Sequence, residues 1–87
     1  MEKFYSLIEI DTVEYPVKFE PIQDDILNEL YFIVTCKGFP PFIIAYDFEN
    51  ASGLKAQGNV PYLFKEHEEL FEMAIEDYNN GWDKQNR

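Results

Sequence analysis

Residues 62–80 read YLFKEHEELFEMAIEDYNN, and this stretch carries the strongest periodic pattern in the chain. Side chains at the i, i+3, i+4 and i+7 spacing of one helical face are Leu63, His67, Leu70, Phe71, Ala74, Ile75 and Tyr78. The opposite face holds Glu68, Glu69, Glu72 and Glu76. Pro61 suits the first turn of this helix, with Asn59 or Val60 as its cap, and Gly81 suits the C-terminal cap. The pattern predicts one amphipathic C-terminal helix.

Four short segments before the helix have the residue types and the alternation of β-strands. They are residues 3–10, 13–20, 30–36 and 42–48. The second segment alternates strictly between apolar and polar side chains, which is typical of a strand with one buried face. Its Pro16 has no N–H to donate, so we expect this strand at an edge of the sheet or at a bulge.

Turns and connections separate these strands. Asp11 and Thr12 are placed to form a tight hairpin, and residues 37–41, with one Gly and two Pro, form a second turn. Residues 21–29 are polar and predict a connection that includes one helical turn. Residues 49–61 predict the longest loop, because they contain two Gly, one Pro and several small polar side chains.

Length and composition fit one small domain over residues 1–87. The chain is 46% hydrophobic and 17% aromatic, which supplies large side chains for a core and is too apolar for a disordered tail. We expect the α+β class, with an antiparallel sheet of about four strands, in two hairpins, packed against the C-terminal helix. No run approaches the roughly 20 apolar residues of a membrane-spanning helix, and the N-terminal sequence lacks a signal-like apolar stretch. A cytoplasmic location is therefore expected.

The charge balance of the chain is strongly acidic. Seventeen Asp and Glu residues face seven Lys and Arg, so the formal net charge at pH 7 is −10. A compact domain with this surplus repels polyanions, which argues against direct binding to nucleic acid or to an anionic membrane. The same surplus favours rapid approach to a basic surface. The charge therefore predicts a basic protein as the partner, such as a nuclease or a nucleic-acid-binding effector.

Few residues in the chain can carry catalysis. Cys36 is the one cysteine and lies in a continuous apolar run, where a buried, inert thiol is the usual case. His67 is the one histidine and lies on or beside the apolar stripe of the helix. Zinc sites need more Cys or His ligands than these two, and no glycine motif for phosphate is present. We predict a protein that is not an enzyme and has no catalytic residues, metal site or cofactor; a small enzyme using Cys36 and His67 is the alternative.

Aromatic residues near the second turn can serve either the core or a partner. Phe39 and Phe42 could be exposed anchors, but residues of this kind more often pack under a sheet. The sequence therefore favours the core for both. Trp82 can equally cover the helix end or anchor a partner, and the pattern does not separate these two roles.

The acidic side of the predicted helix is the candidate partner-binding site. Its residues are Glu66, Glu68, Glu69, Glu72, Glu76 and Asp77, with Lys65 the one cation nearby. Like charges four residues apart cost a helix a few tenths of a kcal/mol per pair. Such a repeated cost is consistent with a use, because rows of carboxylates can replace phosphates in a basic groove. A plain solvated face is the alternative interpretation. Asp24, Asp25, Glu29, Asp47 and Glu49 would widen the patch if the fold gathered them.

A local pattern at the end of the helix resembles a known family. Phe71, Ala74 and the Asn80-Gly81-Trp82 ending are similar to a run in one of the type II-A anti-CRISPR proteins, which are small phage-encoded inhibitors of CRISPR effectors. The match covers about a dozen residues, with a spacing about three residues longer here. The resemblance implies a protein whose carboxylates occupy a nucleic-acid-binding groove as a DNA mimic, and it assigns no role to single residues.

Charge and resemblance together lead to one main hypothesis. The chain is expected to be a non-enzymatic acidic protein that blocks a basic nucleic-acid-binding surface of a partner. One alternative is an immunity protein or antitoxin that neutralises a partner toxin. Another is a small housekeeping domain whose acidity serves only solubility. The sequence does not indicate the oligomeric state.

Overall fold

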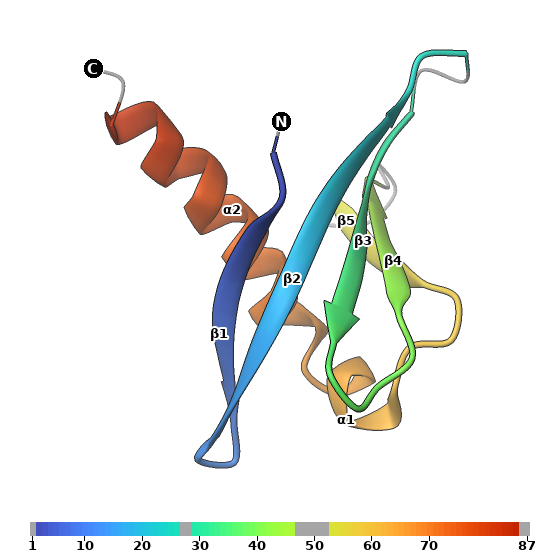
Figure 1. Cartoon of the computed structure of the whole chain (residues 1–87), viewed down its shortest axis with the longest axis vertical. Coiled ribbons are helices and arrows are strands. Elements are labelled where there is room, and N and C mark those ends of the chain that lie inside the picture. Colours follow the sequence, from blue (N-terminus) through green and yellow to red (C-terminus); the bar gives the residue numbers. More distant parts are fainter. Residues whose placement is uncertain (1, 27–28, 47–52, 86–87) are drawn as a thin grey trace.

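The computed structural model describes the backbone of residues 2–26, 29–46 and 53–85, and the side chains of the last helix up to Tyr78. Five strands form one antiparallel sheet within these residues, and two helices follow it (Figure 1). The elements are β1 (Phe4–Ile10), β2 (Val13–Asp24), β3 (Glu29–Cys36), β4 (Phe42–Tyr46), β5 (Leu54–Gln57), α1 (Tyr62–Lys65) and α2 (Glu68–Gln85). The α+β class is confirmed, but the described residues form five strands and two helices instead of four and one.

The sheet is a simple meander, with the strands side by side in the order in which they occur along the chain. The predicted hairpin at Asp11 and Thr12 is confirmed, and it joins β1 to β2 with Ile10 opposite Val13. Both turn residues have positive φ, 51° at Asp11 and 66° at Thr12. This left-handed backbone matches the twist of the flanking strands, although it usually recruits Asn or Gly.

β2 is an interior strand, which corrects the expectation that Pro16 would place it at an edge. The register explains why Pro16 is tolerated. Ile10 and Val13, which close the two-residue hairpin, form a hydrogen-bonded pair. Hydrogen-bonded and non-hydrogen-bonded pairs alternate along the two strands, so Leu7 and Pro16 form a non-hydrogen-bonded pair. The nitrogen of Pro16 points toward β3, whose pairing with β2 starts only at Val17 opposite Cys36. The missing N–H therefore lies beyond the end of β3.

The prediction of a polar connection with a helical turn over residues 21–29 is wrong. β2 runs on to Asp24 and β3 starts at Glu29, so most of this segment is strand. Pro21 pairs with β3, and its nitrogen faces the other side, where β1 has not yet begun because its first residue is Phe4. The nitrogen of each proline in β2 thus points to a side where no neighbouring strand is paired, so the missing N–H breaks no hydrogen bond of the sheet.

The segment predicted as the longest loop contains the fifth strand. β5 pairs with β4, with Ala56 opposite Ile44 and Leu54 opposite Tyr46. Leu54 is buried, which gives this short strand its attachment to the core. Residues 49–52 of the predicted loop and residues 47–48 of the predicted fourth strand lie outside the described residues.

The C-terminal helical region is two helices, not the single helix that the periodicity predicts. α1 ends at Lys65, Glu66 and His67 form a turn, and α2 begins at Glu68. The N–H of His67 donates to the carbonyl of Phe64 at 3.0 Å, which closes the turn. Phe64 of α1 is buried, and it is seven residues before the buried Phe71, so helical spacing continues across the turn and does not reveal the break.

The predicted caps also differ from the structure. Pro61, not Asn59 or Val60, is the N-cap of α1, and no side chain caps the helix there. Gly81 lies inside α2, which continues to Gln85. A single Gly within a helix costs about 1 kcal/mol relative to Ala, so it lowers helix stability without ending the helix.

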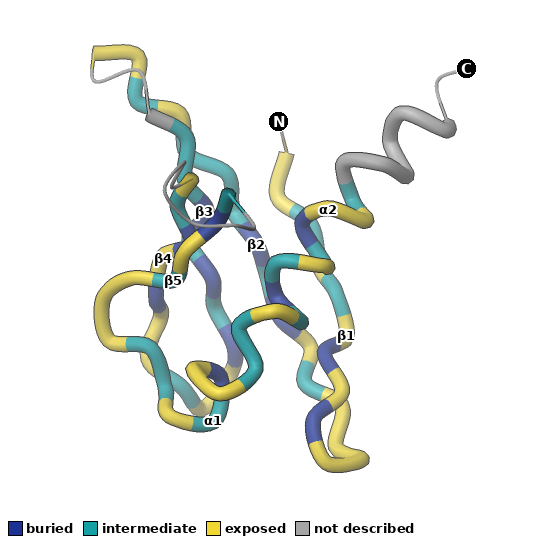
Figure 2. The backbone as a smooth tube through the Cα atoms, turned by 180° about the vertical axis from the view of Figure 1, so that it is seen from behind, coloured by how far each residue is buried: buried dark blue, intermediate teal, exposed yellow. Residues whose placement is uncertain are grey.

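The core lies between one face of the sheet and the two helices (Figure 2). All five strands and both helices contribute buried side chains, which are Ile8, Ile10, Val17, Phe19, Phe32, Val34, Cys36, Phe42, Ile44, Leu54, Phe64, Phe71 and Ile75. The predictions for Phe42, which is buried, and for Phe39, which packs against the core, are confirmed. The helices cover only this face of the sheet.

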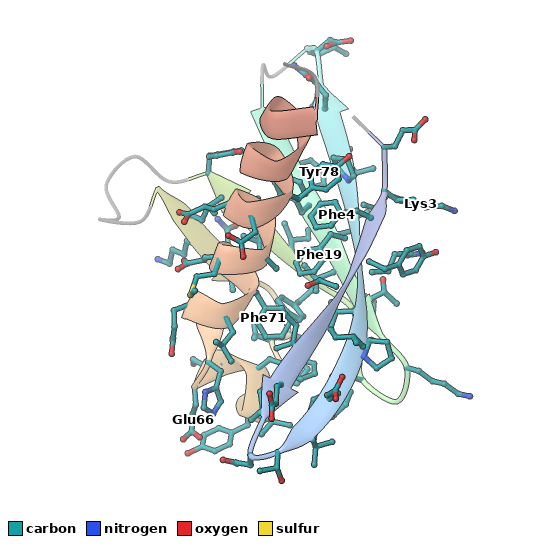
Figure 3. The ribbon with its side chains drawn as sticks, turned by 90° about the vertical axis from the view of Figure 1, so that its left-hand side faces the viewer. Lys3, Phe4, Phe19, Glu66, Phe71 and Tyr78 are labelled. Atoms are coloured by element: carbon teal, nitrogen blue, oxygen red, sulfur yellow. The ribbon has the colours of Figure 1, made fainter. Side chains whose placement is uncertain are left out.

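Aromatic rings make several of the contacts between α2 and the sheet. The ring of Phe4 on β1 stacks on Tyr78 of α2 at 4.0 Å and on Phe19 of β2 at 4.9 Å between centroids. Figure 3 shows these rings, with Phe71, along the space between α2 and the strands. Nearer the start of α2, the ring of Phe64 lies 5.0 Å from that of Phe71. These contacts fix α2 against the sheet.

Candidate partner-binding surface

The structure places all six predicted site residues on one helix and the turn before it. Glu66 lies in the turn between α1 and α2, and the other five residues lie on α2. Glu66, Glu69, Glu76 and Asp77 are exposed, whereas Glu68 and Glu72 are half-buried. The fold therefore leaves this group of carboxylates accessible along the length of α2 that has described side chains. We call these six residues the acidic face.

Helix geometry shows how the acidic face is arranged around α2. Successive residues turn by roughly 100°, so residues 68, 72 and 76 form a slowly drifting row and residues 69 and 77 continue the arc away from the core. The buried Phe71 and Ile75 occupy the other side. The exposed Met73 lies within the arc, so the surface is carboxylates around one apolar side chain.

The linear charge density of the acidic face is close to that of a nucleic acid. The five carboxylates from Glu68 to Asp77 span about 13.5 Å of helix axis, so their mean spacing over four intervals is about 3.4 Å. A single nucleic-acid strand carries about one charge per 3.4 Å, and a duplex about one per 1.7 Å. No Lys or Arg occurs between residues 66 and 83 to interrupt the series. A basic groove would therefore meet a comparable density of negative charge.

A second group of acidic residues lies at the tip of the β1–β2 hairpin, and the sequence analysis missed it. Glu9 lies directly opposite Glu14, and Asp11 lies in the turn between them. All three residues are exposed. Like charges directly opposite on a sheet are destabilising, so this pair is unfavourable for stability. The two-residue hairpin was a usable signal, because it sets Glu9 opposite Glu14.

The other acidic residues that were expected to widen the patch do not all join it. Asp24 and Asp25 lie at the β2–β3 turn, at the end of the sheet opposite to α1 (Figure 1). Asp47, Glu49 and the side chain of Glu29 lie outside the described residues. Glu9 and Glu14 of the hairpin alternate with core residues, so their side chains lie on the face of the sheet away from α2 and do not extend the acidic face.

A groove of about 320 Å³ separates β1 from α2. Leu7 and Glu9 line it on the strand side, and Leu70, Met73 and Asp77 line it on the helix side. Asp77 is the carboxylate on the helix wall of the groove. Glu9 alternates along β1 with the buried Ile8 and Ile10, so its side chain points to the face of the sheet away from α2.

The two candidate residues of a Cys–His dyad have different surroundings. Cys36, at the end of β3, is only 6% exposed, and burial raises the pKa of its thiol. A raised pKa keeps the thiol protonated at neutral pH, whereas a nucleophilic cysteine needs the thiolate. His67 is half-buried in the turn between the helices. These surroundings give the thiol no activation for nucleophilic chemistry.

Two further features bear on possible functions. Over residues 2–26, 29–46 and 53–85, no group of three or more His, Cys, Asp or Glu side chains is arranged to hold a metal ion. Neither described helix combines the length and the apolar character that crossing a membrane requires.

The residues behind the resemblance have a different setting here. Asn80, Gly81 and Trp82 lie inside α2, and their side chains are outside the described set. The two roles considered for Trp82 therefore stay open. Comparisons with protein-family models, with curated proteins and with solved structures gave no match. The functional argument therefore depends on the surface itself.

Proposed function

We propose that this protein is a non-enzymatic inhibitor that blocks a basic nucleic-acid-binding surface of a partner protein. The acidic face of α2 enters the groove where the partner would hold nucleic acid, and its carboxylates take the place of phosphates. This is the mode of action implied by the resemblance to type II-A anti-CRISPR proteins. The partner keeps its catalytic groups but loses access to its substrate.

The observation that carries the proposal is the uninterrupted acidic face. Its mean spacing of about one carboxylate per 3.4 Å matches the charge spacing of a single nucleic-acid strand. The row of Glu68, Glu72 and Glu76 repeats about every 6 Å along the helix, because four residues rise by that distance. The aromatic packing of α2 holds this spacing before the partner arrives, which reduces the ordering cost of binding.

Electrostatics makes the proposal measurable. Opposite charge steers two proteins together and raises the association rate, and added salt screens this attraction over about 10 Å at 0.1 M. We therefore expect affinity to fall steadily as salt rises. The protein should compete with DNA or RNA for the partner instead of binding nucleic acid itself.

The first experiment is a pull-down with the tagged chain from a lysate of its source cell, eluted with a salt gradient and identified by mass spectrometry. A nuclease or nucleic-acid-binding protein that elutes as salt rises supports the proposal. That partner should then lose its nucleic acid in a competition assay. A toxin without a nucleic-acid substrate would instead support the immunity-protein alternative, and partners insensitive to salt would contradict both electrostatic hypotheses.

Charge-reversal variants test whether partner binding depends on the acidic face or only on the net charge of the protein. We expect the double variant Glu69→Lys, Glu76→Lys to weaken partner binding at least tenfold, because both residues are exposed on α2. The matched control is Glu2→Lys, Asp25→Lys, which changes the net charge equally at exposed positions outside the acidic face. If both double variants weaken binding equally, the surface is wrong and only overall charge acts.

A further inference from the structure

We propose that the groove between β1 and α2 binds an extended, cationic peptide segment of a partner protein, which adds to the sheet as a sixth strand beside β1. This inference goes beyond the proposed function, because it uses backbone hydrogen bonds at a sheet edge and does not require the partner to bind nucleic acid. β1 is the first strand in the sheet order, so its outer edge has no neighbouring strand among the described residues.

The register identifies the backbone groups on this edge. Ile10 and Val13 close the hairpin as a hydrogen-bonded pair, and pair types alternate, so residues 4, 6, 8 and 10 direct their N–H and C=O groups toward β2. Tyr5, Leu7 and Glu9 therefore direct theirs outward, to the open edge. Three residues with outward N–H and C=O groups are a template for one added strand, the arrangement that peptide-binding domains use in β-augmentation.

The groove supplies the side-chain contacts that such a strand needs. A strand added to β1 would lie about 4.8 Å from it, and alternate side chains would point to the helix layer and away from it. The inward side chains would meet Leu70 and Met73 on α2, and Met73 is 54% exposed. The outward side chains of the added strand would instead lie beside Leu7, which is 63% exposed. Apolar surface is thus available to the added strand on both faces of the sheet, from Leu70 and Met73 on one and Leu7 on the other.

Charge selects the occupant of the groove. Its lining residues include two acids, Glu9 and Asp77, and no Lys or Arg. A strand added beside β1 would have Asp77 near its helix-facing side chains and Glu9 near its outward-facing side chains, so Lys or Arg on either face of that strand would meet a carboxylate. A second copy of this chain would instead bring two groups of carboxylates together, on a chain with a net charge of −10. The groove therefore favours a basic segment of another protein over self-association.

The two edges of the sheet differ in how well they are protected. β5, at the other edge, has only four residues and carries Lys55, both common ways to prevent unwanted strand pairing. β1 has seven residues, no proline, exposed Tyr5 and Leu7, and one charged residue, Glu9, at its end near the hairpin. A longer edge with exposed apolar side chains is a risk for aggregation unless a partner covers it. The contrast indicates that β1, and not β5, is the edge used for binding.

The test uses a defined probe, an acetylated and amidated peptide of sequence Lys-Val-Lys-Ile-Lys-Val-Lys. We expect it to slow amide hydrogen exchange of Tyr5, Leu7 and Glu9 at least tenfold in nuclear magnetic resonance spectra of the full chain, while amides of β5 are unchanged. The Glu-Val-Glu-Ile-Glu-Val-Glu peptide should bind at least tenfold more weakly. Of two probes N-methylated on alternate sets of amides, one should lose binding and the other retain it.

Groove variants make the test specific. Leu7→Lys and Met73→Lys should each weaken the cationic probe at least fivefold, and the control Tyr62→Lys, with the same charge change at an exposed site, should not. Equal binding of both N-methylated probes, or of the acidic peptide, would overturn the proposal. So would a dimer whose β1 edge is protected without peptide, because a second copy would then be the occupant.

The two proposals fail separately. The Glu69→Lys, Glu76→Lys variant, which removes charge from the acidic face, should leave the slowed exchange of the β1 edge in place at saturating probe. If that variant loses partner binding while the cationic probe still slows amide exchange on β1, both proposals are supported. If the variant loses partner binding but the probe does not slow exchange on β1 in the parent chain, only the proposal about the β1 edge is overturned.

Discussion

Phe64 offers the sharpest test of how this fold is stabilised. Its ring is 1% exposed and lies among four other rings, at 4.6 Å from Phe39, 5.0 Å from Phe71, 5.8 Å from Tyr15 and 6.1 Å from Phe42 between centroids. It is also the one buried side chain of α1. The Phe64→Ala variant removes the ring from this cluster and the anchor from α1.

The expected cost can be estimated from burial. Truncation of a buried Phe to Ala costs about 3–5 kcal/mol, and partial loss of several aromatic contacts places this site in the middle of that range, at about 4 kcal/mol. A domain of this size has a free energy of unfolding of about 4–13 kcal/mol. The variant should therefore be severely destabilised, and a less stable parent would leave it largely unfolded. Phe64→Leu, which keeps most of the volume, should cost less than about 1.5 kcal/mol.

Urea denaturation followed by circular dichroism measures these differences. The m-value should be unchanged between the parent and the Leu variant, so that the midpoint reports stability. Tyr62→Ala, on the same helix but 76% exposed, is the matched control and should stay within about 0.5 kcal/mol of the parent. A loss below about 1.5 kcal/mol for Phe64→Ala, or an equal loss for Tyr62→Ala, would refute the aromatic cluster as the main support of α1.

Two further changes test the hairpin and the buried thiol. Thr12→Gly should raise stability by about 0.5–1 kcal/mol, because a β-branched residue at φ 66° pays a left-handed penalty that Gly does not. Thermal unfolding should then show a higher Tm, and an unchanged or lower Tm would contradict the reasoning. Burial raises the pKa of Cys36, so above about pH 8.5 the unfolded chain loses a proton that the folded chain keeps, and the free energy of unfolding falls as pH rises. Urea titrations from pH 7 to pH 10 should show a smaller fall for Cys36→Ala, and equal slopes would show that the thiol does not contribute.

Local patterns predicted the class of the fold but not its connections. The alternation in residues 13–20 correctly gave a strand with one buried face, and the Asp11-Thr12 pair gave the hairpin. Pro16 misled the assignment because the rule about proline concerns one missing N–H, and whether that N–H is needed depends on where β3 ends. The position at which a neighbouring strand ends is a tertiary fact that a single strand does not encode.

Segments whose partners lie far along the chain were the hardest to predict. β5 has only four residues, two of them polar, and its pairing with β4 stabilises it more than its own propensity. Helical spacing through residues 62–80 joined two helices into one, because the buried Phe64 and Phe71 are seven residues apart and keep the helical period across the turn. Hydrophobic periodicity indicates which side chains share one face, but it does not show whether the helix is continuous.

The acidic residues of the candidate site could be predicted because they follow one another along a single helix. The groove beside it was missed because its position depends on the arrangement of the sheet. All six acidic residues fall on α2 or the turn before it, as their spacing implied. The groove beside β1 could not be foreseen, because it depends on which strand lies at the edge and on the crossing of α2 over it. Glu9 and Asp77 are 68 positions apart in sequence, and they share that groove only in the folded chain.

The acidic face is sustained by the aromatic core beneath it. Repulsion between Glu68 and Glu72, and between Glu72 and Glu76, costs α2 a few tenths of a kcal/mol per pair, or about 0.4–1 kcal/mol together. Burial of Phe71, 1% exposed on the opposite side of the same helix, contributes several times as much. An isolated α2 peptide would lack that contribution and would hold the carboxylates only in a fraction of its conformations. The ordered array of charges is therefore a property of the whole domain, and binding should be lost when the core is weakened even if every carboxylate is retained.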